Sequence, residues 1–214
     1  MRIESIEKAH KGVKYSVSLD DGTALLLSRE VIVDFGLRKN DELNREMVAS
    51  ITEAQLYHNA YYAAGRLLDY RMRTRSELDQ RLLKKGYPIK VVEKVIEKMS
   101  QLGLIDDSRF ADAFIASKIA AKPIGRRELE RGLREKGISK EAAQTAVLQV
   151  SDEDTQLELA MKAARTKMRS LRRFEPRKRQ EKIVAFLARR GFDWDVIKKA
   201  TRKIFKGDAD AVDL

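Results

Sequence analysis

Residues 127–150, RELERGLREKGISKEAAQTAVLQV, carry the pattern that decides the fold of this chain. Leu129 and Leu133 stand eight and four residues before Gly137, so both fall on one side of a short helix that the glycine ends. Ile138 can fold back on the last turn of that helix, and the serine after it is a good N-cap for the next one. The stretch therefore predicts two helices joined by a tight turn.

The same pattern occurs three times. Aligned on their glycines, SELDQRLLKKGYPIKVVEKVIEKM (76–99) and EKIVAFLARRGFDWDVIKKATRKI (181–204) fall into register with it. The glycines are 51 and 54 residues apart, and Lys or Arg precedes each one, where a cation complements the negative end of a helix dipole. A period near 51 has room for three helices of about a dozen residues with their turns. We therefore expect three-helix repeats, whose first helices begin near residues 55, 108 and 154.

The beginning of the chain has a different pattern. Apolar residues alternate in VKYSVSL (13–19), Asp20-Asp21-Gly22 supplies a turn, and TALLLS (23–28) is a second apolar run. Alternation on both sides of such a turn is typical of a β-hairpin. The expected fold is therefore mainly α, with tandem three-helix repeats forming an elongated curved array and a small N-terminal region that contains a β-hairpin.

The predicted domain boundaries follow the repeat. Each unit is too small to bury its own apolar faces fully, so we expect neighbouring units to pack end to end. The predicted domains are an N-terminal β-hairpin region and linker (1–55), three-helix repeat 1 (56–106), repeat 2 (107–152), repeat 3 (153–206) and an acidic tail (207–214).

Composition narrows the class of protein. The chain has no cysteine, which excludes disulfides, thiolate metal sites and a cysteine nucleophile. No stretch approaches the ~18 apolar residues of a membrane span and the N-terminus lacks a signal-peptide core, so we expect a cytoplasmic protein without membrane contact. The net charge is +11, and residues 154–214 hold 17 Lys and Arg against nine Asp and Glu. Such an excess favours a polyanion or an acidic protein surface as partner.

Groups for catalysis are scarce. His10 and His58 are the only histidines and have no nucleophile at a matching spacing, and there is neither a P-loop nor a GxGxxG motif. Tyr57, Tyr61, Tyr62 and Tyr70 in one predicted helix, and Trp194, are better suited to core packing than to a stacking platform, since no basic groove interleaves them. We expect a protein that is not an enzyme and has no catalytic residue, metal or cofactor.

The acidic pair in GLIDDSRFA (103–111) can be read as a metal site or as a helix cap. A calcium loop needs more oxygen ligands at definite spacing, and only Ser108 is near. Capping is favoured, because Asp is a preferred N-cap and complements the positive end of a helix. The predicted structural junction between two repeats consists of Gly103, Asp106, Asp107, Arg109 and Phe110.

Basic side chains follow the predicted repeats. Arg127, Arg131 and Arg134 share one face of a helix, opposite its leucines. Arginine suits phosphate and carboxylate because its planar fork makes two parallel hydrogen bonds, although a solvated face remains the alternative for any single residue. The candidate partner- or DNA-binding residues are Arg73, Arg75, Arg81, Lys84, Lys85, Arg126, Arg127, Arg131, Arg134, Lys136, Arg172, Arg173, Arg177, Lys178, Arg179, Arg189 and Arg190.

The repeat over about residues 56–206, with GLIDDSRFADAFI (103–115) and GRRELERGLREKGIS (125–139), resembles the RecX family of bacterial regulators of the RecA recombinase. The DDSRFA junction and the L...L..KG pattern occur together in the order typical of that family. The third copy is less regular, with Arg190 where the others have Lys85 and Lys136.

The resemblance implies a non-enzymatic modulator, typically an inhibitor, that lies in the groove of the RecA filament on DNA. It would suppress the ATPase and strand exchange of RecA and promote filament disassembly, in homologous recombination, DNA repair and the SOS response. Its implied partners are the RecA filament and single- or double-stranded DNA, and it would act as a monomer in the cytoplasm. The basic faces would contact RecA, DNA phosphate or both. The alternative is a general nucleic-acid-binding protein that acts through these faces without RecA.

Overall fold

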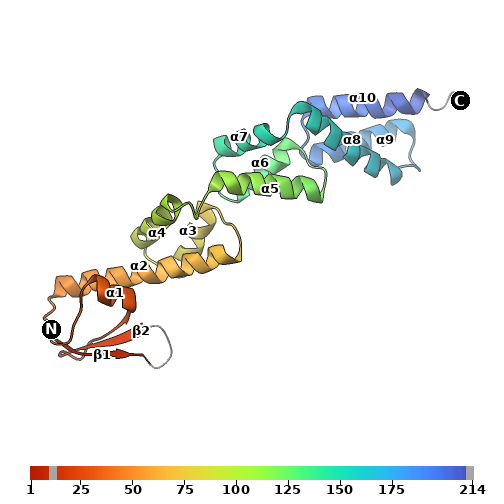
Figure 1. The fold of residues 1–214 in the computed structure, drawn as a ribbon. Coiled ribbons are helices and arrows are strands. Elements are labelled where there is room, and N and C mark those ends of the chain that lie inside the picture. The colour runs from red at the N-terminus through yellow and green to blue at the C-terminus, as the bar shows by residue number, and fades with distance from the viewer. Residues whose placement is uncertain (10–13, 211–214) are drawn as a thin grey trace. The chain divides into compact units, whose positions relative to one another are not determined.

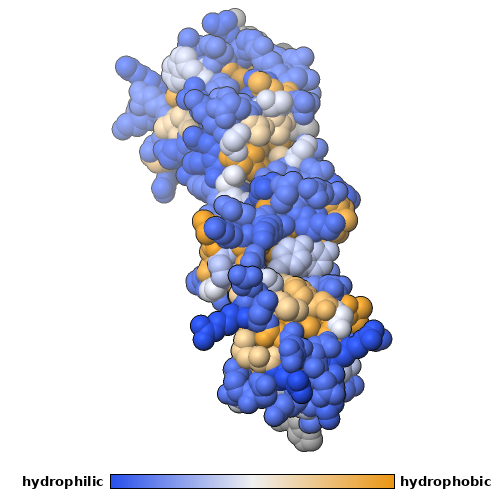
Figure 2. Space-filling view, turned by 90° about the vertical axis from the view of Figure 1, so that its left-hand side faces the viewer, coloured by the Kyte–Doolittle hydropathy of each residue, from blue (hydrophilic) through white to orange (hydrophobic). Residues whose placement is uncertain are grey.

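The computed structural model of the protein describes residues 1–9 and 14–210, in which three strands precede a series of helices (Figure 1). The chain divides into two compact units, an N-terminal unit (Met1–Ile105) and a C-terminal unit (Asp106–Leu214). None of the helices in the described residues combines the length and apolar character needed to cross a membrane. On the face that Figure 2 shows, hydrophilic residues predominate and hydrophobic ones gather in separate patches.

The N-terminal unit begins with a three-stranded antiparallel sheet in the order β1 (Ile3–Lys8), β2 (Lys14–Leu19) and β3 (Ala24–Ser28). The pairing of β2 with β3 confirms the predicted hairpin, although Val13, its expected first residue, lies outside the described residues. The strand β1 is an addition to the prediction. Its sequence gives little signal because only Ile3 is fully buried and the register shifts after it.

Two helices follow the sheet, the short α1 (Arg29–Asp34) and the long α2 (Arg45–Tyr70). The expected helix start near residue 55 was wrong, because Asn44 caps α2 with its side-chain oxygen accepting from the Met47 N–H at 2.8 Å. The first half of α2 places Ile51 in the core under the sheet, and the second half places its buried alanines in the core of the first repeat. One helix therefore serves two cores.

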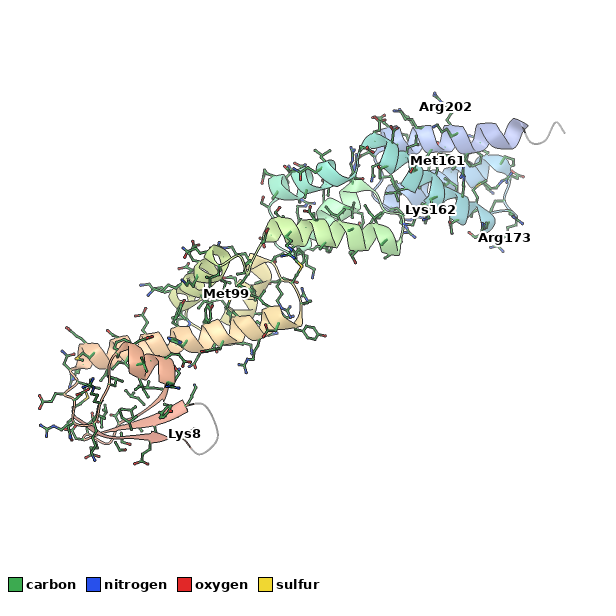
Figure 3. All side chains as sticks on the ribbon, in the orientation of Figure 1. Lys8, Met99, Met161, Lys162, Arg173 and Arg202 are labelled. Atoms are coloured by element: carbon green, nitrogen blue, oxygen red, sulfur yellow. The ribbon has the colours of Figure 1, made fainter. Side chains whose placement is uncertain are left out.

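The tandem three-helix repeats are confirmed. After α2, the helices are α3 (Arg75–Lys84) and α4 (Ile89–Gln101), then α5 (Asp107–Ala121), α6 (Arg126–Glu135) and α7 (Lys140–Val150), then α8 (Glu153–Arg169), α9 (Pro176–Arg189) and α10 (Trp194–Asp210). Each set of three encloses its own hydrophobic cluster, as with the fully buried Met99 of α4, which Figure 3 labels. Because α10 continues to Asp210, the stretch predicted as an acidic tail begins inside a helix, and residues 211–214 lie outside the described ones.

The repeated glycine ends the middle helix of each set, as predicted. Gly86, Gly137 and Gly191 have φ values of +87°, +82° and +80°, which is the left-handed region that closes a helix. The N–H of the next residue donates to the carbonyl of the leucine four residues before the glycine, at 3.2–3.3 Å in all three turns. Those leucines are fully buried. In each repeat, one hydrogen bond therefore links the residue after the glycine to a leucine of the core.

The predicted N-cap Ser139 is confirmed for α7, where its hydroxyl accepts from the Ala142 N–H at 3.2 Å. Thr74 caps α3 in the same way and accepts from the Glu77 N–H at 3.1 Å. The expectation that the aromatic residues of α2 and Trp194 pack in the core holds only in part. Tyr57 and Tyr61 pack against the core of the first repeat, but Tyr62, Tyr70 and Trp194 are exposed. A long helix that is covered on one face leaves the other aromatic positions in solvent.

Candidate nucleic-acid and protein interface

The junction residues after α4 have structural partners. Gly103 has φ +68°, and the Leu104 N–H donates to the Met99 carbonyl at 2.9 Å, which ends α4. Asp106 is the N-cap of α5 and accepts from the Arg109 N–H at 2.9 Å. Asp107 lies in the first turn of α5, the Arg109 side chain is exposed, and Phe110 is buried in the core of the second repeat. Among the described residues no group of His, Cys, Asp or Glu side chains has the geometry to hold a metal ion.

The basic face of α6 is largely neutralised by neighbouring carboxylates. Arg127 Nε lies 2.8 Å from Asp193 Oδ1, and Arg131 Nη2 lies 2.6 Å from Glu128 Oε1. The hydrogen bond that the Arg131 guanidinium donates to Glu128 raises the pKa of Arg131. Arg134 is exposed on the same face. A ligand that binds here therefore has to compete with existing ion pairs for two of the three arginines.

Three of the predicted interface arginines serve the fold instead. The guanidinium of Arg126 donates to the Ser151 carbonyl, and Arg190 Nη1 donates to the Pro123 carbonyl at 3.1 Å. Arg73 is buried, with its Nε donating to the Leu67 carbonyl at 2.9 Å. Burial, together with the charges of Arg71 and Arg81, lowers the pKa of Arg73. These side chains hold loops and helix ends in place.

Two glycines bring the second and third repeats into contact within the C-terminal unit. The Gly125 N–H donates to the Arg190 carbonyl at 2.9 Å, and the Arg127 N–H donates to the Gly191 carbonyl at 3.1 Å. A Cβ atom on Gly125 would lie 2.2 Å from the Gly191 carbonyl carbon. This close approach, which the sequence pattern did not predict, positions the first turn of α6 against the turn after α9.

The remaining candidates are mostly exposed. In the first repeat, Arg75 pairs with Glu97 at 3.3 Å, and Arg81, Lys84 and Lys85 are exposed at the end of α3. Lys136, at the end of α6, is half-buried. In the third repeat Arg173 lies over the Phe174 ring, Arg177 pairs with Glu181 at 3.6 Å, Arg172, Lys178 and Arg189 are exposed, and Arg179 is half-buried.

The third repeat has a groove along α8 that is lined by several cations. One hollow of about 420 Å³ is lined by Arg165, Met168, Arg169, Arg172, Arg179, Lys203 and Ile204. A second, of about 550 Å³, is lined by Glu158, Met161, Lys162, Arg165, Thr166 and Arg169. Arg165 and Arg169 line both, so the two hollows form one feature, which we call the α8 groove. Figure 3 labels Met161 and Lys162 on α8.

The candidate binding residues predicted from the sequence include Arg172 and Arg179 of this groove. Lys162, Arg165 and Arg169 follow i, i+3, i+7 and so share a helix face, which is a signal that could have found them. Lys203 lies on α10, and no spacing along the chain relates it to α8.

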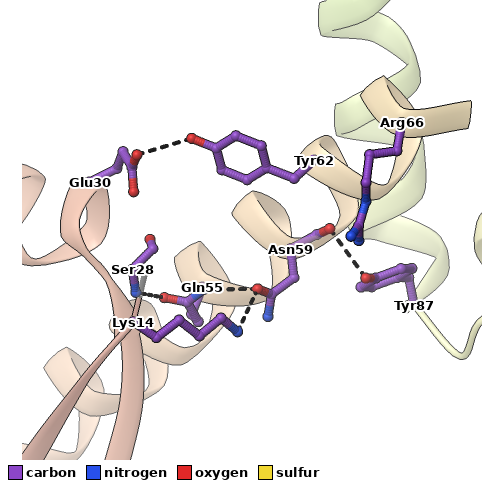
Figure 4. A pocket seen from close by; sticks show the side chains of 8 residues that line it. All are labelled: Lys14, Ser28, Glu30, Gln55, Asn59, Tyr62, Arg66 and Tyr87. Atoms are coloured by element: carbon purple, nitrogen blue, oxygen red, sulfur yellow. Dashed lines mark hydrogen bonds between the residues drawn. The ribbon is translucent and has the colours of Figure 1, made fainter. Parts of the chain in front are cut away.

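The N-terminal unit contains a pocket of about 660 Å³ that is lined by the sheet, α1, α2 and the turn before α4 (Figure 4). Gln55 crosses it by accepting from the Ser28 N–H at 2.6 Å and donating to Asn59 Oδ1 at 3.0 Å. Lys14 Nζ also donates to Asn59 Oδ1, and the Tyr87 hydroxyl donates to the Asn59 carbonyl. Most of the polar groups in this pocket thus hydrogen-bond to one another. These hydrogen bonds connect the sheet to α2 and α2 to the first repeat.

This architecture defines a protein of tandem three-helix repeats, with basic side chains on the repeats and a small antiparallel sheet ahead of them. Family models described as the first, second and third three-helix domains of RecX match residues 60–99, 106–147 and 154–201. The chain belongs to the RecX family.

Individual relatives agree. Regulatory protein RecX of Pelodictyon phaeoclathratiforme is 37% identical over 147 residues, which are 69% of this chain and 89% of that protein. Regulatory protein RecX of Limosilactobacillus reuteri is 30% identical over 195 residues, or 91% of this chain and 74% of the relative. A crystal structure of regulatory protein RecX matches with a TM-score of 0.80 and 29% identity, covering 94% of this chain and 98% of that one. The structure of RecX from Lactobacillus salivarius matches with a TM-score of 0.67 and 25% identity, covering 70% of this chain and 97% of that one.

Proposed function

We propose that this protein modulates the RecA recombinase, in the direction of inhibition, by binding in the groove of the RecA filament on DNA. The observation that carries the proposal is the match of three consecutive RecX domains to three consecutive repeats of the chain. Exposed cations on those repeats support it, because both DNA phosphate and acidic protein surface attract them. The protein would act as a monomer in the cytoplasm, in homologous recombination, DNA repair and the SOS response.

The interface we propose consists of the exposed candidates. Arg73, Arg126 and Arg190 are assigned to the fold because each donates to a backbone carbonyl of another segment. The exposed candidates on the third repeat are supported by the charge excess of residues 154–214.

The DNA-dependent ATPase of RecA tests the proposal directly. RecA and single-stranded DNA are mixed with increasing amounts of the protein, at a DNA concentration high enough to remove simple competition for DNA. We expect ATP hydrolysis and strand exchange to fall as the protein is added. An ATPase rate that does not respond would contradict a role in RecA regulation.

A triple Arg127→Ala, Arg131→Ala, Arg134→Ala variant tests the α6 face. We expect weaker suppression of RecA, with thermal unfolding measured in parallel because Arg127 also pairs with Asp193. A matched control replaces the exposed Lys90, Lys118 and Lys140, which are outside the proposed interface. If the folded triple variant suppresses RecA as well as the control does, the α6 face is not part of the interface.

The second candidate function is nucleic-acid binding without RecA, which the cations of the α8 groove favour. It predicts that the protein binds DNA without RecA, with an affinity that falls steeply as the salt concentration rises. Lys and Arg side chains that bind phosphates release counterions from the DNA, and this release becomes less favourable at high salt. The RecA measurement and the DNA measurement are independent, so either function can fail alone.

A further inference from the structure

The cations of the α8 groove lie on one side of the third repeat. Lys162, Arg165 and Arg169 are spaced by three and four residues on α8, so neighbouring side chains start about 5–6 Å apart. All three are exposed. Arg172 continues the series beyond the helix end, and Lys203 reaches the same hollow from α10. Cations from three segments thus face one concave surface.

Among the described residues, the arginines of the α8 groove have no carboxylate partner. In the part of the chain that the structure describes, no ion pair within 4.0 Å involves Arg165, Arg169 or Arg172. Of the described residues that line the groove, one is acidic, namely Glu158 of the second hollow. The α6 face differs, since two of its arginines are paired. The positive charges of these side chains therefore repel one another, and a bound anion would offset this repulsion.

Arg179 of α9 adds a second observation. It lines the first hollow, and its buried Nε atom has no hydrogen-bond partner among the residues that the structure describes. A reorientation of this side chain toward an anion in the hollow costs no hydrogen bond at Nε. The free protein thus holds a guanidinium close to the groove that is available for a ligand oxygen.

The shape of the groove favours one of the two anionic partners, DNA phosphate, over the other, an acidic protein surface. The groove is concave and extends through two joined hollows, which suits a narrow chain with charges at regular intervals. Met161, Met168 and Ile204 supply apolar surface between the cations, against which sugar rings can pack. The described residues that line the two hollows include no aromatic ring on which a base could stack.

From these observations we propose that the α8 groove binds the phosphodiester backbone of a single nucleic-acid strand, without base preference. Arg165 and Arg169 contact successive phosphates, and Arg179 turns toward the nearer one. The inference rests on the second candidate function, nucleic-acid binding, because it assigns DNA rather than RecA to this part of the third repeat.

Fluorescence anisotropy with a labelled 20-nucleotide single strand, without RecA, tests this assignment across a range of salt concentrations. We expect the Arg165→Gln, Arg169→Gln variant to lose about tenfold or more in affinity at low salt. Its plot of log K against log salt should be shallower by about 1.4, at roughly 0.7 per phosphate for single strands. The control variant Lys90→Gln, Lys140→Gln has the same change in charge on exposed helix starts and should keep the slope of the unmodified protein. Circular dichroism verifies that both variants are folded.

The outcomes separate the hypotheses. Equal slopes for the groove variant and the control overturn the groove assignment. Displacement of the strand by inorganic phosphate at matched ionic strength would also overturn it, since the site would then take the free ion. Equal affinity for dT and mixed-sequence strands supports backbone recognition, and a strong base preference contradicts it. The RecA ATPase measured with the unmodified protein decides the proposed function independently of all these results.

Discussion

Arginine residues of similar appearance in the sequence have three different roles in this protein. Arg126 donates to a backbone carbonyl, Arg131 pairs with Glu128, and Arg169 lines a groove in which it has no carboxylate partner among the described residues. Helical spacing predicts which face of a helix an arginine occupies, but not which group its guanidinium contacts. That partner is distant in sequence in the decisive cases, as with Arg190 and Pro123. The candidate site could therefore be predicted as a set of faces and not as a set of contacts.

Gly125 is the residue at which a single added carbon should matter most. In Gly125→Ala the new methyl group would overlap the backbone of Gly191, so the turn after α9 has to move. We expect a loss of about 3 kcal/mol in the free energy of unfolding, the upper range for overpacking. Urea unfolding followed by circular dichroism measures it.

Gly65→Ala is the matched control. Gly65 lies inside α2 and a Cβ atom there meets nothing within 4 Å. Alanine is favoured over glycine in a helix interior by about 0.5–1 kcal/mol, so this variant should be more stable than the unmodified protein. A Gly125→Ala variant that unfolds at the same urea concentration as the unmodified protein would disprove the close contact.

Asp152 makes one helix start sensitive to acid. Its side chain caps α8, and the hydrogen bond from the Thr155 N–H lowers the pKa of the carboxyl below its ordinary value. The unfolded chain therefore takes up this proton more readily, and the stabilisation is lost as the pH falls through the lowered pKa. Asn also caps helices but does not titrate. The difference in Tm between the protein and Asp152→Asn should be largest at pH 7 and shrink toward pH 3. A difference that is the same at both pH values would contradict this cause.

At the scale of secondary structure, the helices with a strong periodic signal and a terminal glycine were predictable. The bond from Phe192 to Leu187, repeated in the other turns, explains why the offset between glycine and leucine is fixed. The start of α2 was not predictable, because its first half packs under a sheet rather than against its own repeat. The α8 groove also escaped prediction, since α8, α9 and α10 converge on it only in the folded chain.

One buried amide, that of Gln55, contributes to the contact between α2 and the sheet. In Gln55→Leu the Ser28 N–H loses its acceptor, and a buried donor without a partner costs about 1–3 kcal/mol. We expect a reduction of that size in the free energy of unfolding. Thr52→Ala, an exposed change on the same helix, should stay within about 0.5 kcal/mol of the unmodified protein. If the two variants are equally stable, Gln55 does not hold the sheet.

At the scale of the whole molecule, stability is divided among separate hydrophobic clusters. Leu78 belongs to the core of the first repeat, and Ile183 and Leu187 belong to that of the third. Each of these side chains is fully buried, so replacement by alanine should cost about 2–5 kcal/mol.

Hydrogen exchange measured by mass spectrometry tests this division. Leu78→Ala should speed exchange in the amides of the first repeat, and Leu187→Ala in those of the third. Effects of Leu78→Ala and Leu187→Ala should add, whereas Ile183→Val and Leu187→Ala, which share a cluster, should not. Faster exchange throughout the chain in either single variant would show that the clusters are not separate.

The long helix α2 has a consequence for insertions and deletions. Its 26 residues make a rod of about 39 Å, with Ile51 under the sheet and Ala60 in the first repeat. Adding or removing one residue between these positions would rotate one contact face against the other by about 100°. An added seven residues, close to two full turns, would restore the angle. Changes of length in this part of the chain are therefore expected in steps of about seven residues, and single-residue changes should separate the sheet from the helix that carries it.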